Sequence, residues 1–492
     1  MKYLLTLLPI KKNEIARFAV ISLMMLMILF IYSIERTVKD TIIVNEMGAE
    51  FISAIKLYGT LPFAVLLMLI YAKLSNEINK TKIFHLFNGF FVSYFMVFTF
   101  IINPNISYYR FDLNWMKYSY VHLAYFIAMI ENWSYSLYFI LAELWGSVML
   151  SLMFWQTANQ VFKITEAKRI YPLFGLFAQL GLIASGELLR LFSDKNVFQG
   201  GWQQSLEYIN FSVLFASVLL SAFYWILTNL LVSNDVVNAE IVKKKQKIGF
   251  IKSLGQVFTS KYIGLITLLI LCYGISINII EGIWKAQVGA VYTNKQDYAN
   301  FMANLQTLTG VASMISMLSG SYILSKISWR SAAFITPIIL FITGSVFCIT
   351  SIYQEQVIEI IPFVTLTPVT IVFIGLLQNV LGKATKYAFF DATKEIAYIP
   401  LDESLKSKGK AAADVIGGRL GKSGGALVQQ FLLILALHFN PLFVNLKPGE
   451  ALISLSSILF GVFTIIMLVW LLSIGLLSRE FYKMTKNHEQ SL

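Results

Sequence analysis

The chain has 492 residues, of which 57% are hydrophobic and only 13% are charged. A soluble protein has about 25% charged residues, because most of its surface faces water. The composition therefore excludes an ordinary soluble protein and indicates a surface that mostly faces lipid. The two cysteines, Cys272 and Cys348, lie in apolar runs without a metal-binding or redox spacing, which is typical of core residues and predicts no disulfide.

Runs of about 20 apolar residues, long enough to cross a bilayer as a helix, follow one another along the chain. In order they cover 15–38, 54–74, 83–102, 133–160, 170–192, 209–232, 262–286, 300–325, 331–351, 360–381, 414–439 and 452–477. The first is expected to be retained, because no small-residue cleavage site marks it as a signal peptide. These runs predict an all-α polytopic membrane protein with twelve transmembrane helices.

The aromatic-rich stretch 104–132 lies between the third and fourth predicted spans. Tyr and Trp favour the headgroup level of a bilayer, so we expect an interfacial loop or lid here. A thirteenth span is the alternative, and it would reverse the orientation of every later loop.

Basic residues are distributed unevenly among the segments that join the spans. With the N-terminus inside, the inner segments hold 27 Lys and Arg and the outer segments hold 8. Cytoplasmic loops of membrane proteins carry such an excess, so the bias predicts twelve spans with both termini cytoplasmic. The net charge of +12 is then explained by topology and by anionic lipid, and nucleic-acid binding has no support.

The charged gap at 233–261 contains the basic run Lys243–Lys247 and divides the spans six and six. We therefore expect an N-terminal six-helix half at 1–232, a basic cytoplasmic linker at 233–261 and a C-terminal six-helix half at 262–492. Two such halves, related by an axis along the membrane normal, are typical of a major-facilitator-like fold.

The loop segments account for 35 of the 39 basic residues, and the remaining four, Arg36, Lys39, Arg419 and Lys422, lie in predicted spans or at their ends. A charge at the centre of a membrane helix costs about 2.5–3.5 kcal/mol on insertion scales, so its presence indicates a function. Each pair has i, i+3 spacing and shares a helix face. The two spans belong to opposite halves, so both pairs are expected to face a central cavity and bind phosphate oxygens. The alternatives are snorkelling of the first pair beside Asp40 and continuation of the preceding basic loop by the second.

Glycines are dense around the second pair, from Gly417 to Gly425. Near a helix N-terminus they let backbone N–H groups approach an anion, and within a helix they permit close packing; the two uses are compatible. The segment is not the phosphate-binding loop of an ATPase, because Ile416 stands where that motif requires glycine. We therefore expect transport driven by a gradient or by exchange.

Two carboxylates lie in otherwise apolar spans, Glu143 in the fourth and Glu281 in the seventh. An intramembrane carboxylate is by default the partner of a cavity cation or a proton site. A structural salt bridge is the alternative, and Lys285 at i+4 is a local partner for Glu281. The predicted substrate-binding residues are therefore Arg36, Lys39, Glu143, Glu281, Lys285, Arg419 and Lys422.

The rest of the sequence offers no recognisable chemistry. The four histidines have no metal-ligand spacing, and no catalytic nucleophile motif occurs. We expect no metal, no cofactor and no enzymatic activity. A lipid-linked transferase is the enzymatic alternative, but the outer loops lack the acidic metal cluster or catalytic loop that such enzymes usually need.

Seven short motifs follow one another across residues 15–480. They are Thr37–Thr41, Ala142–Gly146, Phe154–Gln156, Glu281–Lys285, Phe390–Glu395, Tyr398–Leu401 and Gly417–Gly425. In this order they resemble motifs of the nucleotide transporters, or ATP/ADP translocases, of obligate intracellular bacteria and plant plastids. No single motif is specific for this family, but the seven motifs in this order are.

The resemblance implies exchange of external ATP for internal ADP by alternating access across the bacterial inner membrane, by which an intracellular bacterium draws energy from its host. By motif, the membrane charges linked to transport in the family fall on Lys39, Glu143, Glu281 and Lys422. Members of the family differ in cargo, so GTP, CTP or UTP as substrates, and co-transported phosphate or protons, remain alternatives.

Other details of the sequence leave the cargo open. Glu35 precedes Arg36 where the family pattern leads us to expect no acid, and we expect it to tune the cation cluster. Asp391 and Lys394 could take part in substrate binding according to the resemblance, but a role in a gate or in a structural turn is an equal alternative. Proton-coupled uptake of another anion, with Glu143 as the proton site, is a further alternative to exchange.

Overall fold

The structure, a computed structural model, describes residues 10–231, 260–360, 366–401 and 403–490, with the side chains of 164, 168, 403–412, 414–416, 419, 422 and 486–490 outside the description. Within these ranges all regular structure is helical. Eleven helical segments of the described chain are long and apolar enough to cross a membrane. A further long helix, α21 (Glu403–Phe439), completes the twelve that the sequence predicts.

The helices before the central linker correspond to the first six predicted spans. Span 1 is α2 (Ile15–Glu46), preceded by η1 (Lys12–Glu14). The others are α3 (Glu50–Ala54), η2 (Ile55–Thr60) and α4 (Leu61–Glu77) in span 2; α5 (Lys80–Val97) and η3 (Phe98–Ile102) in span 3; α9 (Trp133–Trp145), η6 (Gly146–Phe154) and α10 (Trp155–Val161) in span 4; α11 (Ile164–Phe192) in span 5; and α12 (Gly201–Ile226) and η7 (Leu227–Leu231) in span 6.

The helices after the linker correspond to the last six spans. They are α15 (Lys261–Val291), α16 (Lys295–Lys326), α17 (Trp329–Ile352), α19 (Pro368–Thr385) with η9 (Lys386–Phe390) and α20 (Asp391–Ala397), α21, and α23 (Ser456–Gln490). Shorter helices join them: α18 (Gln354–Ile360), η10 (Pro441–Asn445) and α22 (Glu450–Ser454). Most of the predicted linker 233–261 lies outside the described residues, which resume at residue 260.

Several helices extend beyond the apolar runs that predicted them. Span 1 was expected to end near residue 38, but α2 continues to Glu46 without interruption. An apolar run marks the part of a helix that faces lipid or core, whereas the backbone hydrogen bonds continue until a capping signal stops them. This extension sets Arg36 and Lys39 inside span 1 rather than at its end.

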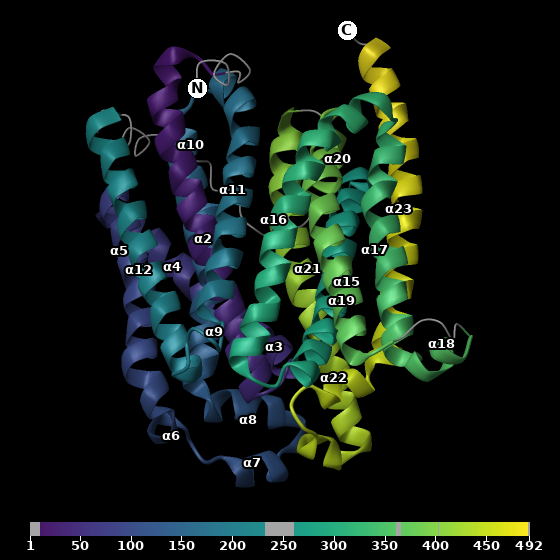
Figure 1. Ribbon diagram of the computed structural model, residues 1–492. Coiled ribbons are helices and arrows are strands. Elements are labelled where there is room, and N and C mark those ends of the chain that lie inside the picture. The colour runs from purple at the N-terminus through teal and green to yellow at the C-terminus, as the bar shows by residue number, and fades with distance from the viewer. Residues whose placement is uncertain (1–9, 232–259, 361–365, 402, 491–492) are drawn as a thin grey trace.

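The segment 104–132 is divided into short helices: η4 (Asn103–Asn105), α6 (Ile106–Tyr109), α7 (Asn114–Ser119), η5 (Val121–Leu123) and α8 (Ala124–Glu131). None of these is long enough to cross a bilayer. The alternative of a thirteenth span is therefore wrong. The short helices lie at the end of the bundle opposite to the end where α2 begins and α23 finishes (Figure 1).

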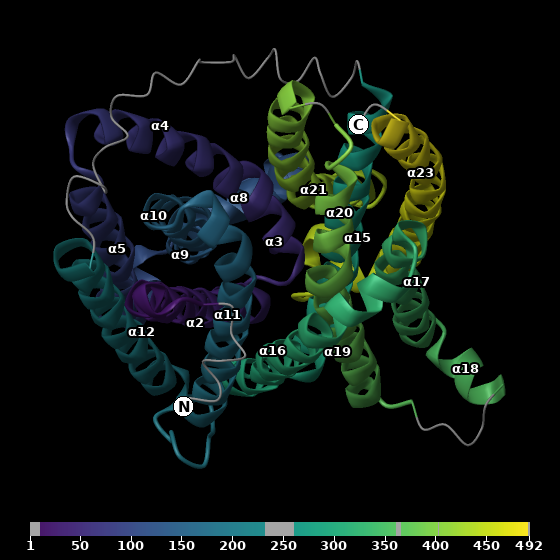
Figure 2. The same cartoon turned by 90° about the horizontal axis from the view of Figure 1, so that it is seen from above.

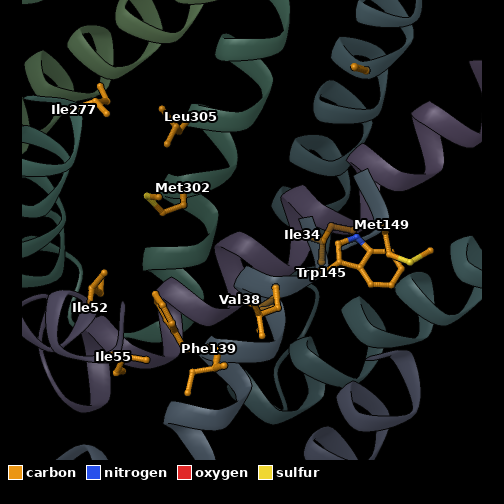
Figure 3. Close-up of a cluster of buried hydrophobic side chains, with 14 of the residues drawn as sticks. Ile34, Val38, Ile52, Ile55, Phe139, Trp145, Met149, Ile277, Met302 and Leu305 are labelled. Atoms are coloured by element: carbon orange, nitrogen blue, oxygen red, sulfur yellow. The ribbon is translucent and has the colours of Figure 1, made fainter. Parts of the chain in front are cut away.

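Viewed along the bundle, the helices before the linker gather on one side and those after it on the other (Figure 2). Across this division α11 packs along α16, and α3 and η2 pack against α21. The buried core continues over the division. Figure 3 shows part of it, with Ile34, Val38, Ile52, Ile55, Phe139, Trp145 and Met149 from spans 1, 2 and 4 and Ile277, Met302 and Leu305 from spans 7 and 8.

Polar contacts join the two sets of helices at the end away from the chain ends. The carboxylate of Glu50, which is 4% exposed, accepts hydrogen bonds from the backbone N–H of Gly449 at 3.0 and 3.2 Å. Gln430 Nε2 donates to Ser53 Oγ at 2.7 Å. Both bonds are buried, so they fasten α3 to α21 and α22 at this end.

Candidate functional site

The span 1 cations are held inside the protein. The Lys39 side chain is only 2% exposed, so the snorkelling alternative is wrong for this residue. Its Nζ lies 3.1 Å from Glu143 Oε2 and 3.0 Å from Asp40 Oδ1. The ammonium also lies 3.8 Å from the centre of the Phe139 ring, a favourable cation–π position.

Asp40 connects span 1 to the other set of helices. One carboxylate oxygen accepts a hydrogen bond from Lys39, and the other lies 2.8 Å from Lys285 Nζ on α15. The side chain of Asp40 is 1% exposed. A fully buried carboxylate is stable only when it is paired and hydrogen-bonded, and Asp40 meets this condition with one lysine from each set of helices.

Glu281 is the point where most of the charges meet. Its Oε1 lies 2.8 Å from Arg36 Nη2, 3.3 Å from Lys285 Nζ and 3.8 Å from Lys383 Nζ. The local pair with Lys285, considered as a structural salt bridge, is present. Because Glu281 also bonds Arg36 of α2, from the helices before the linker, the pair is part of a larger arrangement.

We call this arrangement the central charge network. Its described members are Arg36, Lys39, Asp40, Lys56, Glu143, Glu281, Lys285 and Lys383. Lys56 belongs to it because a small cavity there is lined by Lys56, Glu281 and Lys285, and its Nζ bonds Asn278 Oδ1 at 2.8 Å. The five cations exceed the three carboxylates, so the network attracts anions.

Two cations of the network were not predicted as site residues. Lys56 and Lys383 were assigned to loops, so the expectation that loops carry all basic residues but four is wrong. Lys56 lies in the π-helical turn η2 and Lys383 near the end of α19. For Lys383 the signal in the sequence was weak, because the apolar stretch 387–390 follows it but Thr385 and Lys386 come in between.

The side chains of Arg419 and Lys422 lie outside the described residues, so their predicted role stays a prediction. Their backbone belongs to α21, which runs without interruption from Glu403. The expectation of a helix N-terminus near Gly417 is therefore wrong, because backbone N–H groups this far into a helix are bonded to carbonyls of the preceding turn.

The glycines of α21 serve close helix packing. A Cβ built on Gly274 of α15 would lie 2.7 Å from the backbone of Gly421, and one on Gly425 would lie 2.5 Å from Asn278 Cβ. Such contact is typical of small residues at membrane helix interfaces. It brings α15, which carries Glu281 and Lys285, directly against α21.

Replacing Gly274 with valine is expected to destabilise the protein. The added atoms overlap the backbone of Gly421, and overpacking of a tight contact costs about 1–3 kcal/mol or more. Thermal unfolding of the purified protein in detergent measures the effect as a lower Tm. Gly461→Ala is the matched control, because a Cβ there meets no atom within 4 Å; an equal Tm for wild type and Gly274→Val would contradict the packing argument.

Glu35, which we expected to tune the cation cluster, bonds elsewhere. It is fully buried, and its Oε2 accepts the hydroxyl of Tyr138 on α9 at 2.6 Å. Its Oε1 has no hydrogen-bond partner in the described part of the chain. Glu35 therefore belongs to the packing of α2 against α9, separate from the ion pairs that join Arg36 and Lys39 to the network.

Glu35→Gln is expected to retain transport within about two-fold of wild type, because an amide oxygen still accepts the Tyr138 hydroxyl and no buried ion pair is broken. Initial rates of labelled-nucleotide uptake, normalised to the amount of protein in the membrane, provide the measurement. A loss of more than about ten-fold would place Glu35 in the transport machinery after all.

Asp391 and Lys394 lie where span 10 ends. Asp391 Oδ2 accepts from Lys386 Nζ at 2.7 Å, and Lys394 lies 3.5 Å from Glu395 Oε1. These pairs are local, within η9 and α20, as in the structural-turn alternative. Among the described residues no group of three His, Cys, Asp or Glu could hold a metal ion.

The fold matches solved transporter structures of low sequence identity. A bacterial homologue of the iron transporter ferroportin in an inward-facing state matches with a TM-score of 0.60 and 12% identity, covering 92% of this chain and 98% of that one. A bacterial homologue of the human lysosomal transporter Spinster matches with a TM-score of 0.57 and 11% identity, covering 96% and 99%. These similarities confirm the major-facilitator-like fold class.

Sequence comparison gives the family. The chain is 39% identical over 497 residues to ADP,ATP carrier protein 1 of Rickettsia prowazekii, covering 98% of this chain and 96% of the relative. It is 37% identical to ADP,ATP carrier protein 3 of Rickettsia typhi, covering 97% of each. The family model described as TLC ATP/ADP transporter matches residues 1–481. This multi-pass membrane protein is a transporter and not an enzyme, and it belongs to the TLC ATP/ADP transporter family.

Proposed function

We propose that the chain is a nucleotide antiporter that exchanges external ATP for internal ADP in a bacterial inner membrane, with both termini cytoplasmic. The observation that carries the proposal is the central charge network, an ion-paired cluster in the membrane-spanning region with more cations than carboxylates. The relatives named ADP,ATP carrier protein support nucleotides as the anions. The observed loop charges support the orientation.

The network is suited to release and rebind cations. Arg36, Lys285 and Lys383 share one carboxylate oxygen of Glu281, so none of them has that oxygen to itself. A polyphosphate offers several oxygens, and arginine can bind two of them together. Phosphate binding would therefore exchange shared carboxylate contacts for separate phosphate contacts, without leaving a buried cation unpaired.

The free-energy cost of leaving buried charges unpaired also accounts for exchange. In the structure Asp40, Glu143 and Glu281 hold the cations, and two of these pairs, Arg36–Glu281 and Lys285–Asp40, link helices from opposite halves. Reorienting the halves would separate Arg36 from Glu281 and Lys285 from Asp40, leaving buried charges unpaired. A bound nucleotide supplies replacement partners, so we infer that the protein reorients only when loaded, with the 1–232 and 262–492 halves moving as units.

The hydrogen bonds of Glu50 and Gln430 join helices of both halves at one end of the bundle, as a gate for alternating access requires. They join the halves on the side opposite to the chain ends, which is the outer side in the proposed orientation.

The test is uptake of labelled ATP by cells that express the protein and are either preloaded with ADP or depleted of nucleotide, with each common nucleotide as competitor. Uptake that depends on internal ADP and is reduced most by ATP and ADP is expected. Stronger competition by GTP, CTP or UTP would assign another cargo. Uptake that ignores internal nucleotide and stops when the pH gradient collapses would favour proton-coupled transport, with Glu143 as the proton site.

A further inference from the structure

A cavity of about 500 Å³ adjoins the central charge network. It lies mainly between spans 2 and 4, and pockets of this volume are typical of small-molecule sites. Lys56 and Glu143 of the network contribute to its lining. The network and the cavity therefore form one continuous site.

Two helix faces that run away from the network form the main walls. On span 2, Lys56, Thr60 and Ala64 follow one another at intervals of four residues, a spacing that keeps them on one face. On span 4, Glu143 is followed by Ser147 and Ser151 at the same interval. Spans 2 and 4 run in the same direction in a twelve-span topology, so both faces leave the network toward the same end of the protein.

The chemistry of these walls changes with distance from the network. Beside Lys56 and Glu143 the lining is charged, and further along it combines apolar and aromatic side chains with hydroxyl groups. The apolar and aromatic residues are Leu61, Ala64, Leu67, Met68, Tyr71, Phe87, Leu144, Val148 and Leu152. Ser147 and Ser151 are exposed in this cavity although they lie within a membrane span.

This gradient matches a ligand with a polyanionic end and a partly apolar, hydrogen-bonding end. A free polyphosphate has no apolar group to pack against the aromatic wall, and a lipid chain has no polar group to bond the two serine hydroxyls. We propose that the cavity is the nucleoside subsite, with the phosphates on the network, the ribose beside Ser147 and the base beside Ser151, against the wall that Tyr71 and Phe87 form. This inference rests on the proposed function and goes beyond it by assigning residues to selectivity.

The opposite half reaches the same cavity. Ser423 of α21 lines it together with the residues of spans 2 and 4. A nucleoside there contacts both halves, so its contacts are complete only when both halves line the cavity. Recognition of the nucleoside is thereby linked to the reorientation of the loaded protein.

The test compares two competitors of labelled-ATP uptake: unlabelled ATP, which engages both parts of the site, and inorganic tripolyphosphate, which lacks a nucleoside. For the double variant Ser147→Ala/Ser151→Ala, the apparent affinity for ATP is expected to fall about ten-fold, as the loss of two hydrogen bonds predicts. The inhibition constant for tripolyphosphate is expected to stay at the wild-type value. Ser212→Ala on α12, whose hydroxyl bonds the Tyr208 carbonyl outside the cavity, is the matched control.

The single variants separate ribose from base. Ser147→Ala is expected to reduce the preference for ATP over 2′-deoxy-ATP, and Ser151→Ala to change the ranking of ATP against other ribonucleotides. An unchanged affinity for ATP in the double variant, or an equal change for ATP and tripolyphosphate, overturns the subsite alone. Absence of any nucleotide uptake by the wild-type protein overturns the proposed function and the subsite with it.

Discussion

Glu281→Gln is expected to lower the rate of ATP uptake by at least about 100-fold, because breaking a buried ion pair costs about 3–5 kcal/mol. Glu281 is the shared partner of Arg36 and Lys285, with Lys383 at 3.8 Å. The amide leaves these cations without their common negative charge. The loss is measured as the initial uptake rate at saturating ATP, normalised to the protein present in the membrane.

The matched control for this variant is Glu480→Gln. Glu480 forms an ion pair with Lys261 at 2.9 Å at the exposed end of α23. Such surface pairs contribute little, so this variant is expected to transport like wild type. Uptake by Glu281→Gln at close to the wild-type rate would contradict the role of the network in transport.

Lys383→Met is expected to raise the KM for ATP by about ten-fold or more, as the loss of a charge-assisted contact to phosphate predicts. Lys383 lies 3.8 Å from Glu281, further than Arg36 or Lys285, so it is the least firmly paired of the three. Methionine keeps an unbranched apolar side chain one atom shorter than that of lysine, and removes the charged amino group with its hydrogen-bond donors.

The phosphate role makes a distinctive prediction for a ligand series. Competition by ATP, ADP and AMP is measured for wild type, Lys383→Met and the exposed control Lys73→Met in α4. The effect of Lys383→Met is expected to be largest for ATP and smallest for AMP. The electrostatic attraction lost with the cation is larger when the nucleotide carries more phosphate charges. An equal effect on all three nucleotides would show that Lys383 supports the structure and does not bind phosphate.

The arrangement of the spans could be predicted because lipid imposes a simple requirement. A membrane helix must carry a long apolar run, and loop charges then fix the order of crossing. Both signals are strong in this chain, and the predicted all-α fold with twelve spans is confirmed. The helix ends were less accurate, as α2 shows, because hydropathy does not report where backbone hydrogen bonding stops.

The site could be predicted in part, because a charge inside an apolar run is conspicuous. Arg36, Lys39, Glu143 and Glu281 were singled out in this way, with Lys285 named as the local partner of Glu281. The structure brings all five together. What the sequence could not show was the pairing. Asp40 was regarded as a partner in snorkelling, whereas it links Lys39 on α2 to Lys285 on α15.

The residues that were missed lie near the ends of the predicted spans. Lys56 follows the start of span 2 by two residues and Lys383 follows the end of span 10 by two, so both were counted as loop charges. In the structure each helix continues past its lysine, and Lys56 lies in a π-helical turn. Such turns often mark functional sites in helices, but hydrophobic periodicity does not reveal them.

The measurement that tests the central claim most directly is exchange by purified protein in liposomes. Liposomes are loaded with labelled ADP or left empty, and ATP is added outside. We expect efflux of ADP that requires external ATP, entry of one ATP for each ADP released, and loss of both fluxes in Glu281→Gln. ATP entry into empty liposomes at the same rate, or undiminished exchange by Glu281→Gln, would contradict the central claim.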